Sequence, residues 1–349
     1  MKNCWKQVVM FVLVAVAALW IGKTDAKAAT IVETGSCGKN VTYTLDSDGV
    51  LTISGSGAIK GYAFQNYSSL TSVTILDGVT SIGRYAFSMC TSLTSITIPD
   101  SVTSIGTHAF TQSSSLTSIT IPDSVTSIDC GMFSECSDLM SVTIPDSVTR
   151  IGEEAFRDCS SLKNITIPDS VTSIGNLAFG GCTNLTSVTI PYSVNSIGEQ
   201  VFYRCRCLTN IKIAASNEKC LIINNCDKVE RDIVAATEVL RTGKMDPEVK
   251  MPLNMKIQLS AILIDLHDNA EAKAYVKKVL TKGMKAMIDS GNLELIQVLL
   301  EKTDFVTKKN VDKYVQYAID AKQQEIYLTL IHYKDEIGAY TEISKKFRL

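Results

Sequence analysis

A row of cysteines returns at multiples of 23 residues, and thiols are the most reactive side chains that the chain repeats. The row consists of Cys90, Cys136, Cys159, Cys182 and Cys205, with Ser113 in the one gap. Neighbouring repeats lie within the Cα range that a disulfide permits, so a ladder of bridges is one interpretation. We favour free thiols, because cysteine is a small, often buried residue and a packing or hydrogen-bonding slot would also accept Ser113. Elsewhere, Cys220 and Cys226 are the pair to test first for a bridge, and no C-x-x-C pair suggests zinc.

Aspartates recur at the same interval and could be read as a calcium site. They are Asp77, Asp100, Asp123, Asp146 and Asp169. Like charges about 5 Å apart in water repel by only about 0.8 kcal/mol, so exposed turns can carry them without a metal. Calcium-binding β-solenoids use a Gly-rich nonapeptide, which this sequence lacks. We therefore predict that these aspartates form turns and that the chain has no metal site.

Catalytic groups are scarce in this sequence. His108 occupies a position that other blocks fill with Tyr85, Glu154, Leu177 and Gln200, as is typical of a variable surface residue. The sequence has no HExxH motif, nucleophile elbow or phosphate-binding loop. We predict no catalytic residue, no cofactor and no enzyme activity.

The remaining candidate site is a row of short polar side chains that alternate with apolar residues. The row comprises Ser95, Thr97, Ser118, Thr120, Ser141, Thr143, Asn164, Thr166, Ser187 and Thr189. Such residues suit any exposed strand, which by itself explains the row. As a functional surface it would be a docking face for protein or glycan, or an ordered hydroxyl array of the ice-binding type. The second interpretation needs a flat face, and leucine-rich solenoids usually curve, so we favour the first.

These rows exist because a 23-residue block recurs six times without a gap between Ser72 and Thr209. Such a period predicts a solenoid, in which each unit buries its apolar face only against its neighbours. Within one block, the spacing of residues 93–98 predicts a strand, Pro99-Asp100-Ser101 a turn, and residues 102–105 a second, shorter β segment. Gly106 is expected at a tight bend. The third block departs from the pattern at residues 129–132, where we predict a local kink and no site.

Two columns of apolar residues should form the core of the coil. One consists of Phe64, Phe87, Phe110, Phe133, Phe156, Phe179 and Phe202. The other consists of Leu70, Leu93, Leu116, Leu139, Leu162, Leu185 and Leu208. Stacked rungs place equivalent residues about 4.8 Å apart, so each column should be continuous.

The block I-P-D-S-V-T-S-I-G-x-x-A-F-x-x-C-x-S-L-T resembles the BspA-like leucine-rich repeat, over Tyr62 to about Ile213. Residues 29–60 are similar to the amino-terminal cap of that family, and alternation on both sides of Asp48-Gly49 independently predicts a β-hairpin that covers the first rung. The resemblance implies a secreted or cell-surface protein that binds macromolecules, in related cases host matrix proteins or neighbouring cells.

The two ends of the chain differ from the repeats. Lys2 and Lys6 precede an apolar run of fourteen residues, Val8 to Ile21, and Ala26-Lys27-Ala28 follows, which predicts a signal peptide over residues 1–28. This run is short of the roughly 20 residues that a membrane span needs. We expect export to the cell surface or medium, and no membrane span after cleavage.

The carboxy-terminal part has a second, helical repeat. Residues 287–300 align with residues 318–331 at an offset of 31 residues. The pairing of short helices resembles degenerate ankyrin-like units, although the T-P-L-H signature is absent, and a helical cap is an equal alternative. The predicted organisation is therefore a signal peptide at 1–28, a β-hairpin cap at 29–60, a leucine-rich repeat solenoid at 61–215 and an all-α domain at 216–349.

Charge excludes one class of partner. Residues 30–215 carry 9 Lys+Arg against 15 Asp+Glu, and residues 216–349 carry 21 against 20. Neither part has the basic excess that phosphate binding requires, so we expect no nucleic acid partner. Two functions remain: adhesion or protein interaction through the solenoid face, and a structural, envelope-associated scaffold without a specific host ligand.

Overall fold

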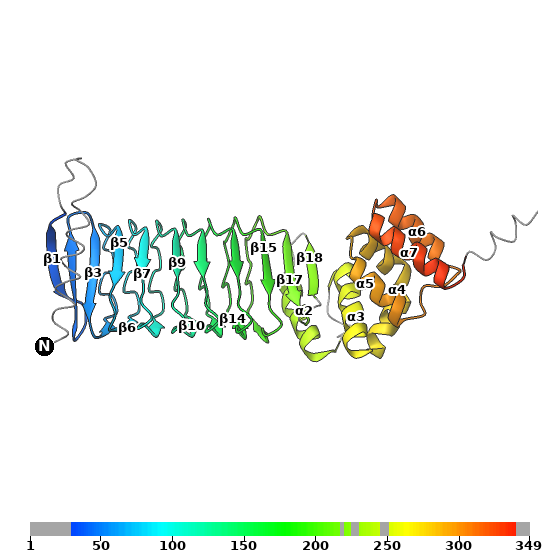
Figure 1. Cartoon of the computed structure of the whole chain (residues 1–349), viewed down its shortest axis with the longest axis horizontal. Coiled ribbons are helices and arrows are strands. Elements are labelled where there is room, and N and C mark those ends of the chain that lie inside the picture. Colours follow the sequence, from blue (N-terminus) through cyan, green and yellow to red (C-terminus); the bar gives the residue numbers. More distant parts are fainter. Residues whose placement is uncertain (1–28, 217–219, 225–229, 245–250, 340–349) are drawn as a thin grey trace, which may run out of the picture.

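The computed structural model describes residues 29–216, 220–224, 230–244 and 251–339. The described residues form a solenoid of stacked rungs followed by a helical region, along the long axis of the molecule (Figure 1). The leucine-rich repeat solenoid with a β-hairpin cap and an all-α carboxy-terminal region is thus confirmed. The predicted signal peptide lies outside the described residues, as does Cys226 of the pair Cys220 and Cys226.

An antiparallel sheet begins the solenoid. It contains β1 (Ile31–Ser36), β2 (Val41–Asp46) and β3 (Val50–Gly55). The predicted hairpin is β2–β3, and Gly49 adopts a φ of 80° in its turn, a conformation that favours glycine. β3 pairs in parallel with the first repeat strand, so the cap continues directly into the solenoid. β1 adds a third strand that the sequence patterns did not indicate.

Each rung contributes one parallel strand to a row that divides into three hydrogen-bonded sheets. These strands are β5 (Ser72–Ile75), β7 (Ser95–Thr97), β9 (Ser118–Thr120), β11 (Ser141–Thr143), β13 (Asn164–Thr166), β15 (Ser187–Ile190) and β17 (Asn210–Ala214). Equivalent residues pair, as Ser118 with Ser141 and Thr166 with Thr189. Figure 1 shows the strands side by side along the solenoid.

A second set of short strands follows the turn in each rung, and in four rungs that turn contains Pro-Asp. It comprises β4 (Gly57–Ile59), β6 (Val79–Ile82), β8 (Ser104–Ile105), β10 (Ser127–Ile128), β12 (Arg150–Ile151), β14 (Ser173–Ile174) and β16 (Ser196–Ile197). The glycine that ends each segment lies against the preceding rung: a Cβ on Gly175 would be 2.4 Å from the backbone nitrogen of Glu153. Close approach of two rungs, and not the bend predicted for Gly106, therefore requires glycine at this position.

The third block is irregular on this side of the coil. Asp129 replaces the glycine, and the second set divides there into a β4–β6–β8 sheet and a β10–β12–β14–β16 sheet. Because a Cβ cannot enter the narrow gap between rungs, the pairing of β8 with β10 is lost. This lost strand pairing is the irregularity that the sequence predicts as a local kink at residues 129–132. The neighbouring turns continue unchanged, since His108 N–H donates to the Cys130 carbonyl and Gly131 N–H to the Glu153 carbonyl.

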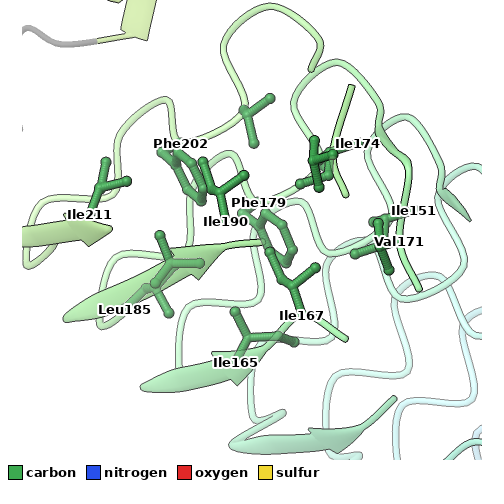
Figure 2. Close-up of a cluster of buried hydrophobic side chains, with 14 of the residues drawn as sticks. Ile151, Ile165, Ile167, Val171, Ile174, Phe179, Leu185, Ile190, Phe202 and Ile211 are labelled. Atoms are coloured by element: carbon green, nitrogen blue, oxygen red, sulfur yellow. The ribbon is translucent and has the colours of Figure 1, made fainter. Parts of the chain in front are cut away.

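The core is built from the predicted columns. All seven phenylalanines and all seven leucines are buried. Consecutive phenylalanine rings stack with centroids 5.4–5.7 Å apart. Figure 2 shows Phe179 and Phe202 inside the coil, with Ile165 and Ile167 on one side and Ile174 on another. Burial of each such side chain contributes about 1.5–3 kcal/mol, so these columns hold the rungs together.

The carboxy-terminal region begins with a strand that the sequence patterns missed. β18 (Cys220–Asn224) pairs antiparallel with β17 and closes the repeat sheet. Six helices follow: α2 (Glu230–Thr242), α3 (Leu253–His267), α4 (Ala270–Asp289), α5 (Leu293–Lys302), α6 (Val311–Asp320) and α7 (Gln324–Glu336). β18 thus precedes the helices at the start of the predicted all-α domain, and the described helices begin at Glu230. A short apolar segment such as this one has no period by which to recognise it.

The 31-residue offset corresponds to two similar helix pairs. Gly291 lies between α4 and α5, and Lys322 lies between α6 and α7, and both adopt a left-handed φ, of 69° and 57°. The helix–turn–helix repeat is present, while its ankyrin-like ancestry stays a prediction. None of the helices in the described ranges is long and apolar enough to cross a bilayer.

Candidate functional site

The predicted polar row occupies the outer face of the first set of strands. Nine hydroxyl residues and Asn164 are exposed, while the apolar residue between each pair points inward. All ten predicted site residues are therefore brought together on one surface, which we call the strand face. Its rungs repeat about every 4.8 Å, the spacing of paired strands.

Hydrogen bonding distinguishes this row from neighbouring hydroxyls. Thr94 Oγ1 donates to the Thr71 carbonyl at 2.9 Å, and Thr172 Oγ1 donates to the Thr149 carbonyl at 3.1 Å. Those threonines join one rung to the next. Within residues 29–216, the nine hydroxyls of the strand face make no such bond, and only Asn164 Oδ1 accepts one, from Thr186 at 3.4 Å. The strand-face hydroxyls thus remain available to a partner.

The cysteine row is a hydrogen-bonding slot inside the coil. Cys136 Sγ donates to the Phe110 carbonyl at 3.1 Å, and Cys159 makes the same bond to Phe133. Ser113 Oγ reaches the Phe87 carbonyl at 2.7 Å, which explains why serine replaces cysteine there. None of the five cysteines in the row forms a disulfide, so the disulfide ladder is wrong and the preferred interpretation is confirmed. Burial raises the pKa of Cys136 to about 12, which keeps the thiol protonated.

The aspartate row lies on exposed turns, and each aspartate except Asp77 directly follows a proline. In the same turns, Ser147 Oγ donates to the Val125 carbonyl at 2.7 Å and Ser170 Oγ to the Val148 carbonyl at 2.7 Å. These bonds join successive turns through neutral groups. Across the part of the chain that the structure describes, no three His, Cys, Asp or Glu side chains gather as metal ligands would.

The third side of each rung, which we call the turn face, holds two columns of residues in the left-handed region. One contains Tyr62, Tyr85, His108, Gly131, Glu154, Leu177 and Gln200, with φ between 52° and 62°. The other contains Asn66, Met89, Gln112, Glu135, Asp158, Gly181 and Arg204, with φ between 57° and 77°. Most are not glycine, although the left-handed region disfavours other L-residues.

The first column begins with an aromatic stack. Tyr62 and Tyr85 stack with ring centroids 5.1 Å apart, and Tyr85 and His108 stack at 4.8 Å. The Arg84 guanidinium carbon is 5.3 Å from the centroids of both tyrosines. The position that the sequence marks only as variable therefore has a definite conformation and definite neighbours.

A groove runs along the second column of the turn face. One wall is formed by Asn66, Met89, Gln112, Glu135 and Asp158. The other wall is formed by Ser68, Thr91, Ser114 and Ser137. The groove has a volume of about 730 Å³ and is open to solvent. The sequence patterns did not predict this groove. The signal that could have located it is the variable residue directly before each cysteine of the row and before Ser113.

Two smaller hollows lie where the last rung meets the helices. One, of about 400 Å³, is lined by Asn210 and residues 290–294. The Asn210 Oδ1 atom is buried, and no hydrogen-bond partner for it lies among the described residues. The other, of about 270 Å³, lies between Tyr192 and Arg241 of α2. Neither hollow combines the nucleophile, base and proton donor that a catalytic site needs.

Comparison with known proteins identifies the repeat. The family model described as a BspA type leucine rich repeat region matches residues 57–158 and 131–228, in six copies altogether. A crystal structure of a leucine rich cell surface protein from Faecalibacterium prausnitzii is 36% identical, with a TM-score of 0.43, and the match covers 57% of this chain and 59% of that one. A crystal structure of a leucine rich repeat protein from T. pallidum is 29% identical, with a TM-score of 0.42 and coverage of 54% and 91%. No curated protein matches the chain.

Proposed function

The repeat region of this chain belongs to the BspA type leucine rich repeat family, and from that premise we propose that the protein is exported to the cell surface, where it binds other macromolecules. The solenoid acts by docking and catalyses no reaction. Its partners are proteins or glycans of a host matrix or of neighbouring cells.

The observation that carries this proposal is the state of the strand-face hydroxyls. Five consecutive rungs, β7 to β15, present two polar side chains each. Hydroxyls can donate and accept hydrogen bonds, and these are not consumed by bonds between rungs. A broad, neutral, regularly spaced surface suits an extended partner and offers no enclosed volume for a small substrate.

A binding array tests the proposal. Purified residues 29–349 would be applied to immobilised collagen, fibronectin, laminin, mucin and whole bacterial cells. We expect binding to at least one class, and we expect the Thr120→Lys plus Thr166→Lys variant to bind at least about tenfold more weakly, because lysine adds bulk and charge to the docking face. Both threonines are exposed, so the fold should persist.

The matched control places the same two substitutions on another side of the solenoid. Thr80→Lys plus Thr126→Lys changes two exposed threonines beside the second set of strands, chosen because Thr172 on that side donates a hydrogen bond to the preceding rung. This variant should bind like the wild type. Binding of the wild type to none of the surfaces would contradict the proposal and favour the scaffold function, and equal loss in both variants would contradict the strand face as the site.

A further inference from the structure

The second column of the turn face keeps long side chains where glycine would be more favourable. Met89, Gln112 and Glu135 adopt φ of 59°, 60° and 60°. Gly181 lies in the same column, so the rung accepts glycine at this position. Backbone strain that persists at a surface points to a function of the side chains that it holds. Here those side chains form one wall of the groove.

The shape of the groove suits a polymer. It extends over five rungs, roughly 19 Å at the spacing of paired strands. It is open to solvent and repeats the same backbone geometry at each step. A groove of this kind holds an internal stretch of a chain, whereas an enclosed pocket would hold a small molecule or a chain end.

The chemistry of the walls excludes two kinds of polymer. Glu135 and Asp158 are acidic, and among the described residues that line the groove none is Lys, Arg or His, which argues against nucleic acids and other polyanions. An extended peptide would need free backbone groups for strand addition. The N–H groups of this column cannot pair with a peptide strand, since Met89 N–H donates to the Thr111 carbonyl, Gln112 N–H to the Ser134 carbonyl and Glu135 N–H to the Arg157 carbonyl.

The remaining groups match the hydroxyls of sugars. Amide, carboxylate and hydroxyl side chains together donate and accept hydrogen bonds, as vicinal sugar hydroxyls require. Gln112 Nε2 already donates to Glu135 Oε2 at 2.9 Å, which aligns an amide and a carboxylate across two rungs. We propose that this groove binds a linear, uncharged polysaccharide. The site is separate from the strand face, so either can fail without the other.

The test uses the purified protein and four linear hexasaccharides as probes: cellohexaose, xylohexaose, mannohexaose and, as the charged comparison, hexagalacturonate. Calorimetry should detect binding of at least one neutral probe and none of the charged one. In Gln112→Gly plus Glu135→Gly, glycine suits the left-handed backbone, so the midpoint of thermal unfolding should not fall. Affinity for the neutral probe should fall at least about tenfold, because two hydrogen-bonding groups are lost.

Two further variants keep the result interpretable. Thr91→Lys blocks the groove at an exposed position with ordinary φ, and it should abolish binding even if the glycine variant were unstable. Thr80→Lys plus Thr126→Lys, which lies outside both the groove and the strand face, should leave hexasaccharide affinity unchanged. Absence of binding to every neutral probe would overturn the proposal, as would undiminished affinity in Thr91→Lys or preference for hexagalacturonate.

Discussion

At the scale of single residues, Glu33 joins the cap to the first rung. Its carboxylate accepts hydrogen bonds from Tyr43 of β2, at 2.5 Å from Oε1, and from Tyr67 of the first turn, at Oε2. These bonds hold the pKa of Glu33 below its ordinary value of 4.5. The same carboxylate raises the pKa of Tyr43 and of Tyr67 to about 12. One side chain therefore links β1, β2 and the solenoid, and the link depends on its charge.

This link predicts acid sensitivity of the cap. Because the folded pKa of Glu33 is depressed, its stabilising contribution is complete above pH 4.5 and is lost as the pH falls through the folded value. Between pH 7 and pH 3, the unfolding temperature of the wild type should fall more than that of Glu33→Gln, which has no charge to lose. Calorimetric scans of both proteins at the two pH values measure this difference in unfolding temperature. The other carboxylates are the same in both proteins, so they do not contribute to the difference. Parallel falls in the two proteins would show that the bonds to Tyr43 and Tyr67 do not stabilise the cap.

At the scale of elements, the distance between rungs is set by one glycine per block. A Cβ would lie 2.6 Å from the Arg84 nitrogen at Gly106, 2.7 Å from the Cys130 nitrogen at Gly152 and 2.4 Å from the Glu153 nitrogen at Gly175. Each clash is with backbone, which cannot rotate aside. The third rung lacks this glycine, and its short strand β10 does not pair with β8 of the preceding rung.

Gly175→Ala should therefore destabilise the solenoid by about 1–3 kcal/mol, the usual cost of overpacking, although alanine is a small residue. Asp129→Ala is the matched control, since the third rung already accommodates a Cβ. It removes the 2.7 Å ion pair with Arg150 and the 3.0 Å hydrogen bond from Ser127 Oγ, both near the surface, so the loss should stay within about 1 kcal/mol. Urea unfolding followed by circular dichroism measures both. Similar losses in the two variants would mean that rung separation is not what glycine controls.

Repetition decided which elements were predictable from the sequence. The strands, the Phe and Leu columns and the cysteine slot recur every 23 residues, and each copy reinforces the assignment of the others. β1 and β18 occur once, so no period revealed them. The left-handed columns were missed because no single residue type marks them. Asn66, Asp158 and Gly181 are types that tolerate a positive φ, whereas methionine, as at Met89, does not indicate one. The groove was missed for the same reason.

At the scale of the whole molecule, a solenoid is stabilised only by contacts between neighbouring rungs, so the position of a defect matters as much as its chemistry. Phe133 is fully buried and stacks between Phe110 and Phe156, with centroids 5.6 Å and 5.4 Å away. Phe202 is 6% exposed and stacks on Phe179, at 5.7 Å. Phe→Ala therefore removes ring contacts with two neighbouring rungs at position 133, but with one at position 202.

Phe133→Ala should cost about 3–5 kcal/mol, because it leaves a cavity between two intact rungs, and Phe202→Ala should cost less. The central defect should also divide the solenoid into two units, since rungs on its two sides no longer stabilise one another through that ring. Hydrogen exchange resolves this: Phe133→Ala should lower protection in β9, β11 and β13, while Phe202→Ala should lower it only near β15 and β17. Uniform loss of protection along the solenoid in both variants would mean that the rungs unfold as one cooperative block and that coupling extends beyond nearest neighbours.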